Sequence, residues 1–177
     1  MLIINLNIFK IFINYFCYRC KCSKFGSINI EEFSRGIQSF NTNSISGVKP
    51  YVIQIKEDLL NITTPDFRQF YYFLFENNLQ NPQKKFLDFD YIELYFTQLF
   101  AHQFSLVKKF LNYHIEVKKK EPVTQDQWNC FLDLLIRIGD NFPKGYSTKD
   151  SWPTLFDDFF NDYCKRNNIE IESDEED

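Results

Sequence analysis

Large apolar side chains recur every three or four residues along most of this chain, and this spacing restricts the fold to packed helices. The stripe that follows Pro65 keeps the 3.6-residue period of an α-helix: Phe67, Phe70, Tyr71, Leu74 and Phe75. Only 5 of the 177 residues are glycine, which argues against a β-sandwich, a barrel or a phosphate-binding α/β fold. We therefore expect an all-α fold, and no segment predicts a convincing sheet.

Capping residues mark where several of these helices begin. Thr64 and Pro65 form an N-cap followed by proline at the first helical position, where the missing N–H leaves no helical hydrogen bond unmade. Asp88 is expected to cap the next helix. Another helix is expected over residues 104–117, and the three lysines that follow predict a solvated helix end.

The C-terminal third carries the clearest helical signal. Thr124 and Gln127 match a capping box, in which each side chain accepts a hydrogen bond from the other residue's backbone N–H. Gly139 is expected to end this helix, and a last helix is expected to start near Ser151. Its apolar face comprises Leu155, Phe156, Phe159, Phe160 and Tyr163.

Charge is unevenly distributed along a chain whose length suits a single domain. The whole sequence carries −4, from 24 acidic and 20 basic residues. From Pro122 onward 13 acidic residues oppose 5 basic ones, a local −8, so residues 1–121 hold 11 acids and 15 bases, a local +4. The acidic part disfavours nucleic acid, whose phosphates need neutralising by Lys and Arg. It favours a basic protein partner.

The five cysteines are an odd number in a chain too large to need disulfides, so reduced thiols in the cytoplasm or nucleus are expected. Cys17, Cys20 and Cys22 form a C-x-x-C-x-C cluster that looks like part of a metal site. Zinc takes four ligands, however, and the two histidines, His102 and His114, lie far along the chain. We expect no metal and no other cofactor.

Residues 1–16, "MLIINLNIFKIFINYF", are apolar enough to raise the question of a membrane span. The run is shorter than the roughly 20 residues that a spanning helix needs, and Asn5, Asn7, Lys10 and Asn14 interrupt it. It also has neither a basic leader nor a small-residue cleavage site. We expect a buried helix and no membrane association.

Residues 25–33, "FGSINIEEF", match the second half of an EF-hand loop. Gly26 would make the sharp turn, Ile28 would pair with a sister loop, and Glu32 occupies the position of the bidentate ligand. The first, third and fifth loop positions offer too few oxygen ligands for Ca²⁺: Lys21, Ser23 and Phe25. The helix pair is expected without the ion.

The segment "DQWNCFLDLLIRIGDNFPKGYSTKDSWPTLFDDFF" resembles the defective-in-cullin-neddylation family, built on the potentiating-neddylation domain. It matches that family's D-x-W-N-x-x-L-D, a tyrosine, an acidic turn and W-P-x-L-x-D-[DE]-F. Upstream, "EEFSRGIQSF" and "FRQFYYFLFE" also resemble family segments, so the match runs from about Ile11 to Tyr163. The family normally has another EF-hand-like helix pair before Ile11, and this sequence lacks it. This difference suggests a truncated form or an incomplete gene model.

The resemblance implies a single helical domain with an EF-hand-like start and a C-terminal helical bundle. Residues 1–40 would form a partial EF-hand-like helix pair without the first EF-hand-like unit. Residues 41–167 would form the helical remainder. Residues 168–177 would be a disordered acidic tail, because like charges outnumber apolar groups there.

Family members bind the winged-helix C-terminal domain of a cullin and the conjugating enzyme that carries the neddylation modifier. The resemblance therefore implies a non-catalytic scaffold that speeds modifier transfer to a cullin lysine, in the cytoplasm and nucleus. By position, the cullin-binding residues are Asp126 and Asp157, with a small residue, Ser151, where the family usually has alanine. Helix-dipole stabilisation is an alternative role for such acids, and Asp162 is expected to pair with Arg166 instead.

The resemblance also implies an apolar pocket for the acetylated N-terminal methionine of the conjugating enzyme. Acetylation removes the terminal charge, so this methionine is buried without an unpaired ammonium. Its lining falls on Ile13, Phe16, Ile28 and Tyr95. Asn77 and Gln98 stand where the family has an aromatic residue and a leucine, which makes the pocket more polar. Ordinary core packing explains these apolar positions equally well.

Three other functions stay open at this point. An EF-hand calcium sensor is disfavoured by Lys21 and Phe25. A cysteine hydrolase would need a thiolate oriented by a histidine, but Cys130 lies inside an expected amphipathic helix and neither histidine sits in a recognisable motif. A helical adaptor of the same fold with a different partner is the main alternative.

Overall fold

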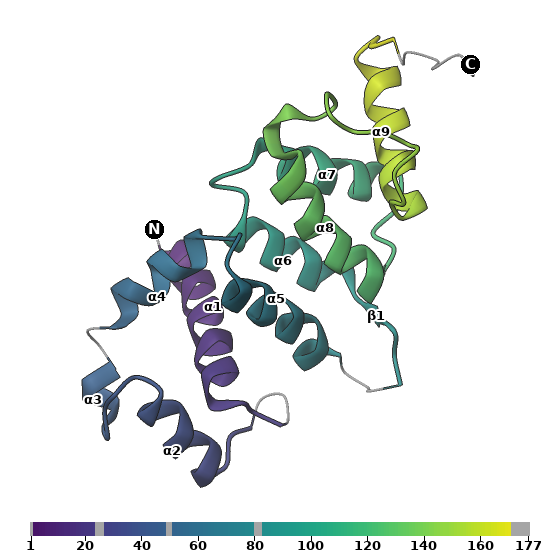
Figure 1. Cartoon of the computed structure of the whole chain (residues 1–177). Coiled ribbons are helices and arrows are strands. Elements are labelled where there is room, and N and C mark those ends of the chain that lie inside the picture. The colour runs from purple at the N-terminus through teal and green to yellow at the C-terminus, as the bar shows by residue number, and fades with distance from the viewer. Residues whose placement is uncertain (1, 24–26, 49–50, 80–82, 171–177) are drawn as a thin grey trace.

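The computed structural model describes residues 2–23, 27–48, 51–79 and 83–170, and within these ranges the chain is almost entirely helical (Figure 1). The helices are α1 (Leu2–Cys20), α2 (Ile30–Gln38), α3 (Ile45–Val48), α4 (Tyr51–Leu60), α5 (Pro65–Asn78), α6 (Phe89–Leu99), α7 (Ser105–Glu116), α8 (Gln125–Arg137), the 3₁₀ helix η1 (Gly139–Asn141) and α9 (Thr154–Arg166). The strands β1 (Phe86–Leu87) and β2 (Val123–Thr124) pair antiparallel. The all-α prediction is confirmed.

Most of the expected helix boundaries are confirmed by capping hydrogen bonds. Thr64 Oγ1 accepts from the Phe67 N–H at 3.1 Å, and α5 begins at Pro65. Thr124 and Gln127 form the complete capping box of α8. Gly139, with a φ of +50°, follows directly after that helix and its C-cap residue. The backbone signals in the sequence were therefore sufficient to place these helix ends.

Two boundary predictions need correction. Asp88 is the N-cap of α6, but its side chain makes no capping hydrogen bond. The last helix begins at Thr154 rather than near Ser151. Trp152 N–H donates to the Asp150 carbonyl at 2.8 Å in a turn, and a residue that precedes proline is disfavoured in helical geometry. Pro153 therefore keeps the chain extended until α9 starts.

A cluster of aromatic rings forms the core of the bundle. Trp128 of α8 and Tyr71 of α5 stack with their centroids 4.4 Å apart. The Tyr71 hydroxyl donates to the Trp128 carbonyl at 2.7 Å, and the Trp128 indole N–H donates to the Tyr71 carbonyl at 3.1 Å. Phe96 of α6 stacks on Phe131 of α8 at 4.0 Å. These contacts join α5, α6 and α8 into one core.

Helix α1 packs against α5 and α6 of this bundle, and α2 packs against α1 (Figure 1). The two helices approach closely at Gly36, where an added Cβ would lie 2.0 Å from Cys20 Sγ. Tyr15 of α1 contacts Phe70 of α5 with a centroid distance of 5.2 Å. None of the helices in the described ranges combines the length and apolarity that crossing a membrane requires.

Glu32, the acid of the degenerate calcium loop, accepts hydrogen bonds from neighbouring residues of the same loop. Its carboxylate accepts from the Ser23 hydroxyl and N–H at 2.7 and 2.9 Å, and from the Asn29 N–H at 3.0 Å. These hydrogen bonds, with that from Asn29 the most important, lower the pKa of Glu32. Gly26 and Phe25 of the predicted loop lie outside the described residues.

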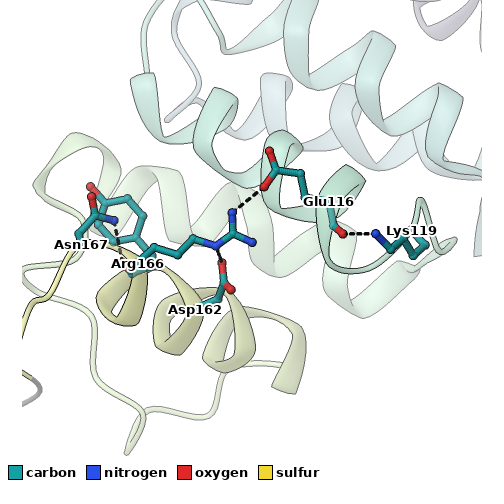
Figure 2. Close-up of polar contacts among 6 residues, drawn as sticks. Glu116, Lys119, Asp162, Arg166 and Asn167 are labelled. Atoms are coloured by element: carbon teal, nitrogen blue, oxygen red, sulfur yellow. Dashed lines mark hydrogen bonds and ion pairs between the residues drawn. The ribbon is translucent and has the colours of Figure 1, made fainter.

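The last helix is tied to α7 by charged side chains. Figure 2 shows Arg166 between Glu116 of α7, at 2.5 Å, and Asp162 of its own helix, at 2.8 Å. Asp158 pairs with Lys118 at 2.7 Å, so the first lysine of the run expected to be solvated is in fact half-buried. The predicted Asp162–Arg166 pair is confirmed.

Candidate functional site

Asp126 lies in the first turn of α8 with its side chain exposed. Its Oδ1 accepts a weak hydrogen bond from the Cys130 thiol one turn later, at 3.8 Å. Burial, followed by the charge of Asp126, raises the pKa of Cys130 to about 11. Neither oxygen of Asp126 contacts a Lys or Arg within the part of the chain that the structure describes.

Asp157 lies in the first turn of α9 and is half-buried. Tyr146 donates its hydroxyl hydrogen to Asp157 Oδ1 at 2.7 Å. The Tyr146 ring is itself fixed by stacking on Phe160 and Trp152, with centroid distances of 4.8 and 6.1 Å. Burial, followed by the hydrogen bond to Asp157, raises the pKa of Tyr146, so this phenol remains a donor. The carboxylate is therefore held in one orientation.

Ser151 is exposed and lies between two residues that contact the far end of α8. Arg137 pairs with Asp150 at 3.0 Å, and its guanidinium carbon lies 5.1 Å from the Trp152 ring centroid. Ser151 thus lies beside the last turn of α8, whereas Asp126 occupies the first. At a rise of 1.5 Å per residue, Asp126 and Arg137 are about 16 Å apart along the helix axis.

The structure therefore brings Ser151 and Asp157 together around Tyr146 and Trp152. Asp126 is carried by the same helix that packs beside them, one helix length away. The sequence did not indicate which residues position the Asp157 carboxylate. Tyr146 occupies the tyrosine position of the family motif, which was the available signal, but no sequence spacing indicates the Arg137–Asp150 contact.

The other aspartates of α8, α9 and the loop between them already have strong partners. Asp133 pairs with Arg68 at 2.7 Å. Asp140 accepts from the Ser105 hydroxyl at 2.9 Å and the Leu106 N–H at 3.2 Å, and so caps α7. The remaining three are in the ion pairs described above: Asp150, Asp158 and Asp162. Within the described residues of this region, Asp126 and Asp157 are the aspartates that neither pair with a cation nor cap a neighbouring helix.

The four residues of the predicted methionine pocket have different environments. Phe16 packs against Phe33 and Phe40 at centroid distances of 6.1 and 6.2 Å. Tyr95 is buried with its edge toward Trp128, at 6.2 Å, and burial raises its pKa. The two aromatic residues thus belong to separate ring clusters.

The two isoleucines of that predicted pocket are accessible. Ile13 is 44% exposed and Ile28 is 39% exposed. None of the four residues lines the cavity at α1, α2 and α5 that is described below. The apolar side chains needed to cover a buried methionine are present. That all four residues line one pocket for this methionine remains a prediction.

The residues named for the alternative chemistries are not arranged for catalysis. Cys130 contacts Asp126 rather than a histidine. His114 is buried between Phe89 and Phe110, at centroid distances of 5.0 and 5.6 Å, and burial lowers its pKa. All five cysteines are free thiols. In the ranges that the structure describes, no group of three or more His, Cys, Asp or Glu side chains is arranged to hold a metal ion.

Comparison with known proteins agrees with the motif. A protein-family model described as cullin binding matches residues 47–162, which is more than half of the chain. DCN1-like protein 3 of Drosophila melanogaster is 28% identical over 137 residues, covering 76% of this chain and 39% of the fly protein. The chain thus spans about two fifths of the length of this relative. It belongs to the cullin-binding family, that of the defective-in-cullin-neddylation proteins, which its W-P-x-L-x-D-[DE]-F motif indicated.

Proposed function

We propose that this chain binds the winged-helix C-terminal domain of a cullin together with the conjugating enzyme that carries the neddylation modifier. It promotes transfer of the modifier to a cullin lysine and forms no covalent intermediate of its own. It acts as a scaffold in the cytoplasm and nucleus. Membership of the cullin-binding family supports this proposal.

One observation about charge carries the proposal. Asp133, Asp150, Asp158 and Asp162 each have an ion-pair partner in the chain, whereas the two family-matched acids, Asp126 and Asp157, have none among the described residues. A carboxylate without a cation gains a charge-assisted hydrogen bond when a basic surface docks. An acid that is already paired gains much less. The two free acids therefore suit a cationic cullin surface.

The support around Asp157 suits a docking site. Tyr146 orients the carboxylate, and the site stands on the first turn of a packed helix rather than on a mobile loop. Side chains that are held in place before binding lose less conformational freedom when a partner arrives. Ser151 is small and exposed, so it leaves room for a side chain of the cullin.

In this proposal the chain speeds modifier transfer only by positioning the two proteins that react. Holding the charged conjugating enzyme beside the cullin makes a bimolecular attack effectively intramolecular. In this proposal Ile13, Phe16, Ile28 and Tyr95 receive the acetylated methionine of the conjugating enzyme. Their apolar side chains suit a terminus that no longer carries an ammonium.

Calorimetric titration with a cullin C-terminal domain tests the acidic site. Asp157→Lys is expected to abolish binding, and Asp157→Asn to weaken it by about tenfold or more, because a buried charge contact is lost. Asp162→Asn on the same helix is the matched control and should leave affinity unchanged, since Arg166 already pairs with Asp162. Circular dichroism checks that each variant folds. Unchanged affinity for Asp157→Lys would remove this residue from the site.

A reconstituted neddylation assay with and without the chain tests the activity. We expect faster modifier transfer with an acetylated conjugating enzyme than with an unacetylated one. Cullin binding without any acceleration would reduce the function to cullin recognition. Absence of both would favour a helical adaptor with a different partner.

A further inference from the structure

A cavity of about 570 Å³ lies where the C-terminal end of α1 meets α2 and α5. It is distinct from both surfaces of the proposed function, since it contains neither the acidic-site residues nor the four pocket residues. Figure 1 shows α1 and α2 on the side of the molecule away from α9, with α5 between α1 and β1. The charged residues of its lining are Arg19, Lys21, Arg35 and Asp66.

Two of its three cations are fixed by backbone carbonyls rather than by carboxylates. Arg19 Nη2 donates to the Ser39 carbonyl at 3.0 Å, and Arg35 Nη1 donates to the Cys20 carbonyl at 3.2 Å. Both carbonyls lie at helix C-termini, where the helix dipole favours a cation. A carbonyl has no formal charge, so these hydrogen bonds do not pair either guanidinium with an anion. Arg19 Nη1 also donates to the Tyr15 hydroxyl at 3.3 Å.

The third cation is placed by the end of α1. Lys21 has a φ of +51°, in the left-handed region. Its N–H donates to the Tyr18 carbonyl at 2.9 Å, and the next N–H, of Cys22, donates to the Cys17 carbonyl at 3.1 Å. This is the helix-ending arrangement that usually takes glycine. Here it carries an exposed lysine at the cavity instead.

The one carboxylate of the cavity is already occupied. Asp66 accepts from the Tyr18 hydroxyl at 2.9 Å and from the Tyr15 hydroxyl at 3.4 Å. No ion pair joins Asp66 to Arg19, Lys21 or Arg35 within the described residues. Among the described residues, the lining of this cavity therefore combines three basic side chains with one acidic side chain.

We propose that this cavity binds an acidic peptide segment of a partner protein. Its volume matches pockets that take ligands of several side chains, which is far more than one small anion fills. Tyr18 and Phe73 line it with rings 5.7 Å apart, an apolar surface for the side chain beside an acidic residue. Fixed guanidinium groups recognise carboxylates through charge-assisted hydrogen bonds.

The test uses the whole chain and a fluorescein-labelled decapeptide rich in Asp and Glu with one central Leu. Its twin has Asn and Gln in place of the acids. Fluorescence anisotropy should show binding of the acidic peptide, no binding of the twin, and loss of affinity with added salt. Lys21→Gln and Arg35→Gln should each weaken binding by about tenfold, the usual effect of losing one charge-assisted hydrogen bond.

Lys108→Gln is the matched control, since Lys108 is exposed on α7 and does not line the cavity. Its affinity should equal that of the unchanged protein. Circular dichroism confirms folding, and Lys21→Gln alone suffices if Arg35→Gln fails to fold. Equal binding of the neutral twin, or an unchanged affinity of Lys21→Gln, overturns the proposal. Displacement of the peptide by equimolar inorganic phosphate would also overturn it, in favour of a small-anion site.

Discussion

The α1–α2 pair and the α8–α9 region use their carboxylates in opposite ways. Glu32 turns inward and accepts three hydrogen bonds, from Ser23 and Asn29. Among the described residues, Asp157 accepts one hydrogen bond, from Tyr146, and its side chain is only half-buried. An acid whose oxygens are satisfied internally stabilises the fold and has little left for a ligand. The number of internal donors therefore separates the structural acid from the candidate binding acid.

The two regions also differ in how their helices are joined. In the bundle, large rings fill the space between α5, α6 and α8. At α1–α2 the absence of a side chain at Gly36 lets the two helices meet. The bundle depends on large side chains, and the α1–α2 contact depends on the absence of one. A large-to-small substitution should therefore destabilise the bundle, and a small-to-large substitution should destabilise the α1–α2 contact.

The largest effect is expected in the bundle, for Trp128→Ala. This side chain is fully buried and stacks on Tyr71, so its removal leaves a cavity and should lower the free energy of unfolding by about 3–5 kcal/mol. Urea unfolding followed by far-UV circular dichroism measures it. Phe86→Ala is the control, because Phe86 is 50% exposed. Equal losses for both variants would contradict the placement of the core at Trp128.

A smaller loss is expected at the α1–α2 contact, for Gly36→Ala. The new methyl group would meet Cys20 Sγ at 2.0 Å, and overpacking of this kind lowers stability by about 1–3 kcal/mol. Within a helix, alanine would otherwise stabilise by about 1 kcal/mol relative to glycine. The same urea experiment shows whether the substitution lowers or raises the free energy of unfolding. Adding Cys20→Ala should restore part of the loss, and a more stable Gly36→Ala would refute the close approach.

Tyr146→Phe should lower the free energy of unfolding by about 1 kcal/mol, the usual effect of one lost hydrogen bond. It should also weaken cullin binding less than Asp157→Asn does, because the carboxylate remains but loses its fixed orientation. Titration calorimetry measures the affinity. Tyr163→Phe makes the same change on α9 at a phenol without a hydrogen bond in the described ranges. Identical affinities for both variants would show that Tyr146 does not position Asp157.

The smallest effect is a pH dependence that differs between His114, on α7 of the helical bundle, and Glu32 of the α1–α2 pair. Burial holds the pKa of His114 below its ordinary 6.5, so the unfolded chain takes up a proton first and stability falls as the pH drops below about 6.5. The pKa of Glu32 is lowered from 4.5 by its hydrogen bonds. Its stabilisation is therefore complete above that value and is lost as the pH falls through the lower folded-state pKa.

Unfolding free energies of the unchanged chain, His114→Leu and Glu32→Gln, measured from about pH 7.5 to about pH 2.5, test this separation. His114→Leu should flatten the upper part of the profile, and Glu32→Gln the lower part. A profile that His114→Leu leaves unchanged would mean that the histidine is not held neutral by the core.

Local signals in the sequence predicted much of the helical framework. Thr64 with Pro65, the Thr124–Gln127 box and Gly139 act through hydrogen bonds and torsion angles of neighbouring residues, so their effect is readable from the order of residues. The start of α9 was misplaced because Pro153 restricts the residue before it. This restriction is itself a property of the sequence, because it depends only on the neighbouring proline.

The candidate site was only partly readable from the sequence. The motif located Asp126, Ser151 and Asp157 through resemblance, but it gave no indication of which nearby acids are neutralised. Asp133 meets Arg68 from another helix, and Asp158 meets Lys118 across 40 residues. Neither periodicity nor spacing encodes such long-range pairs.

The order of residues by itself determined the helical class, most helix ends and the loss of the calcium ligands, because each depends on groups a few residues apart. Only the tertiary structure decided which acids stay without a cation, where Tyr146 holds Asp157, and that Arg19, Lys21 and Arg35 share one cavity. Those outcomes depend on which helices pack together, and electrostatic pairing acts through distance in space rather than along the chain.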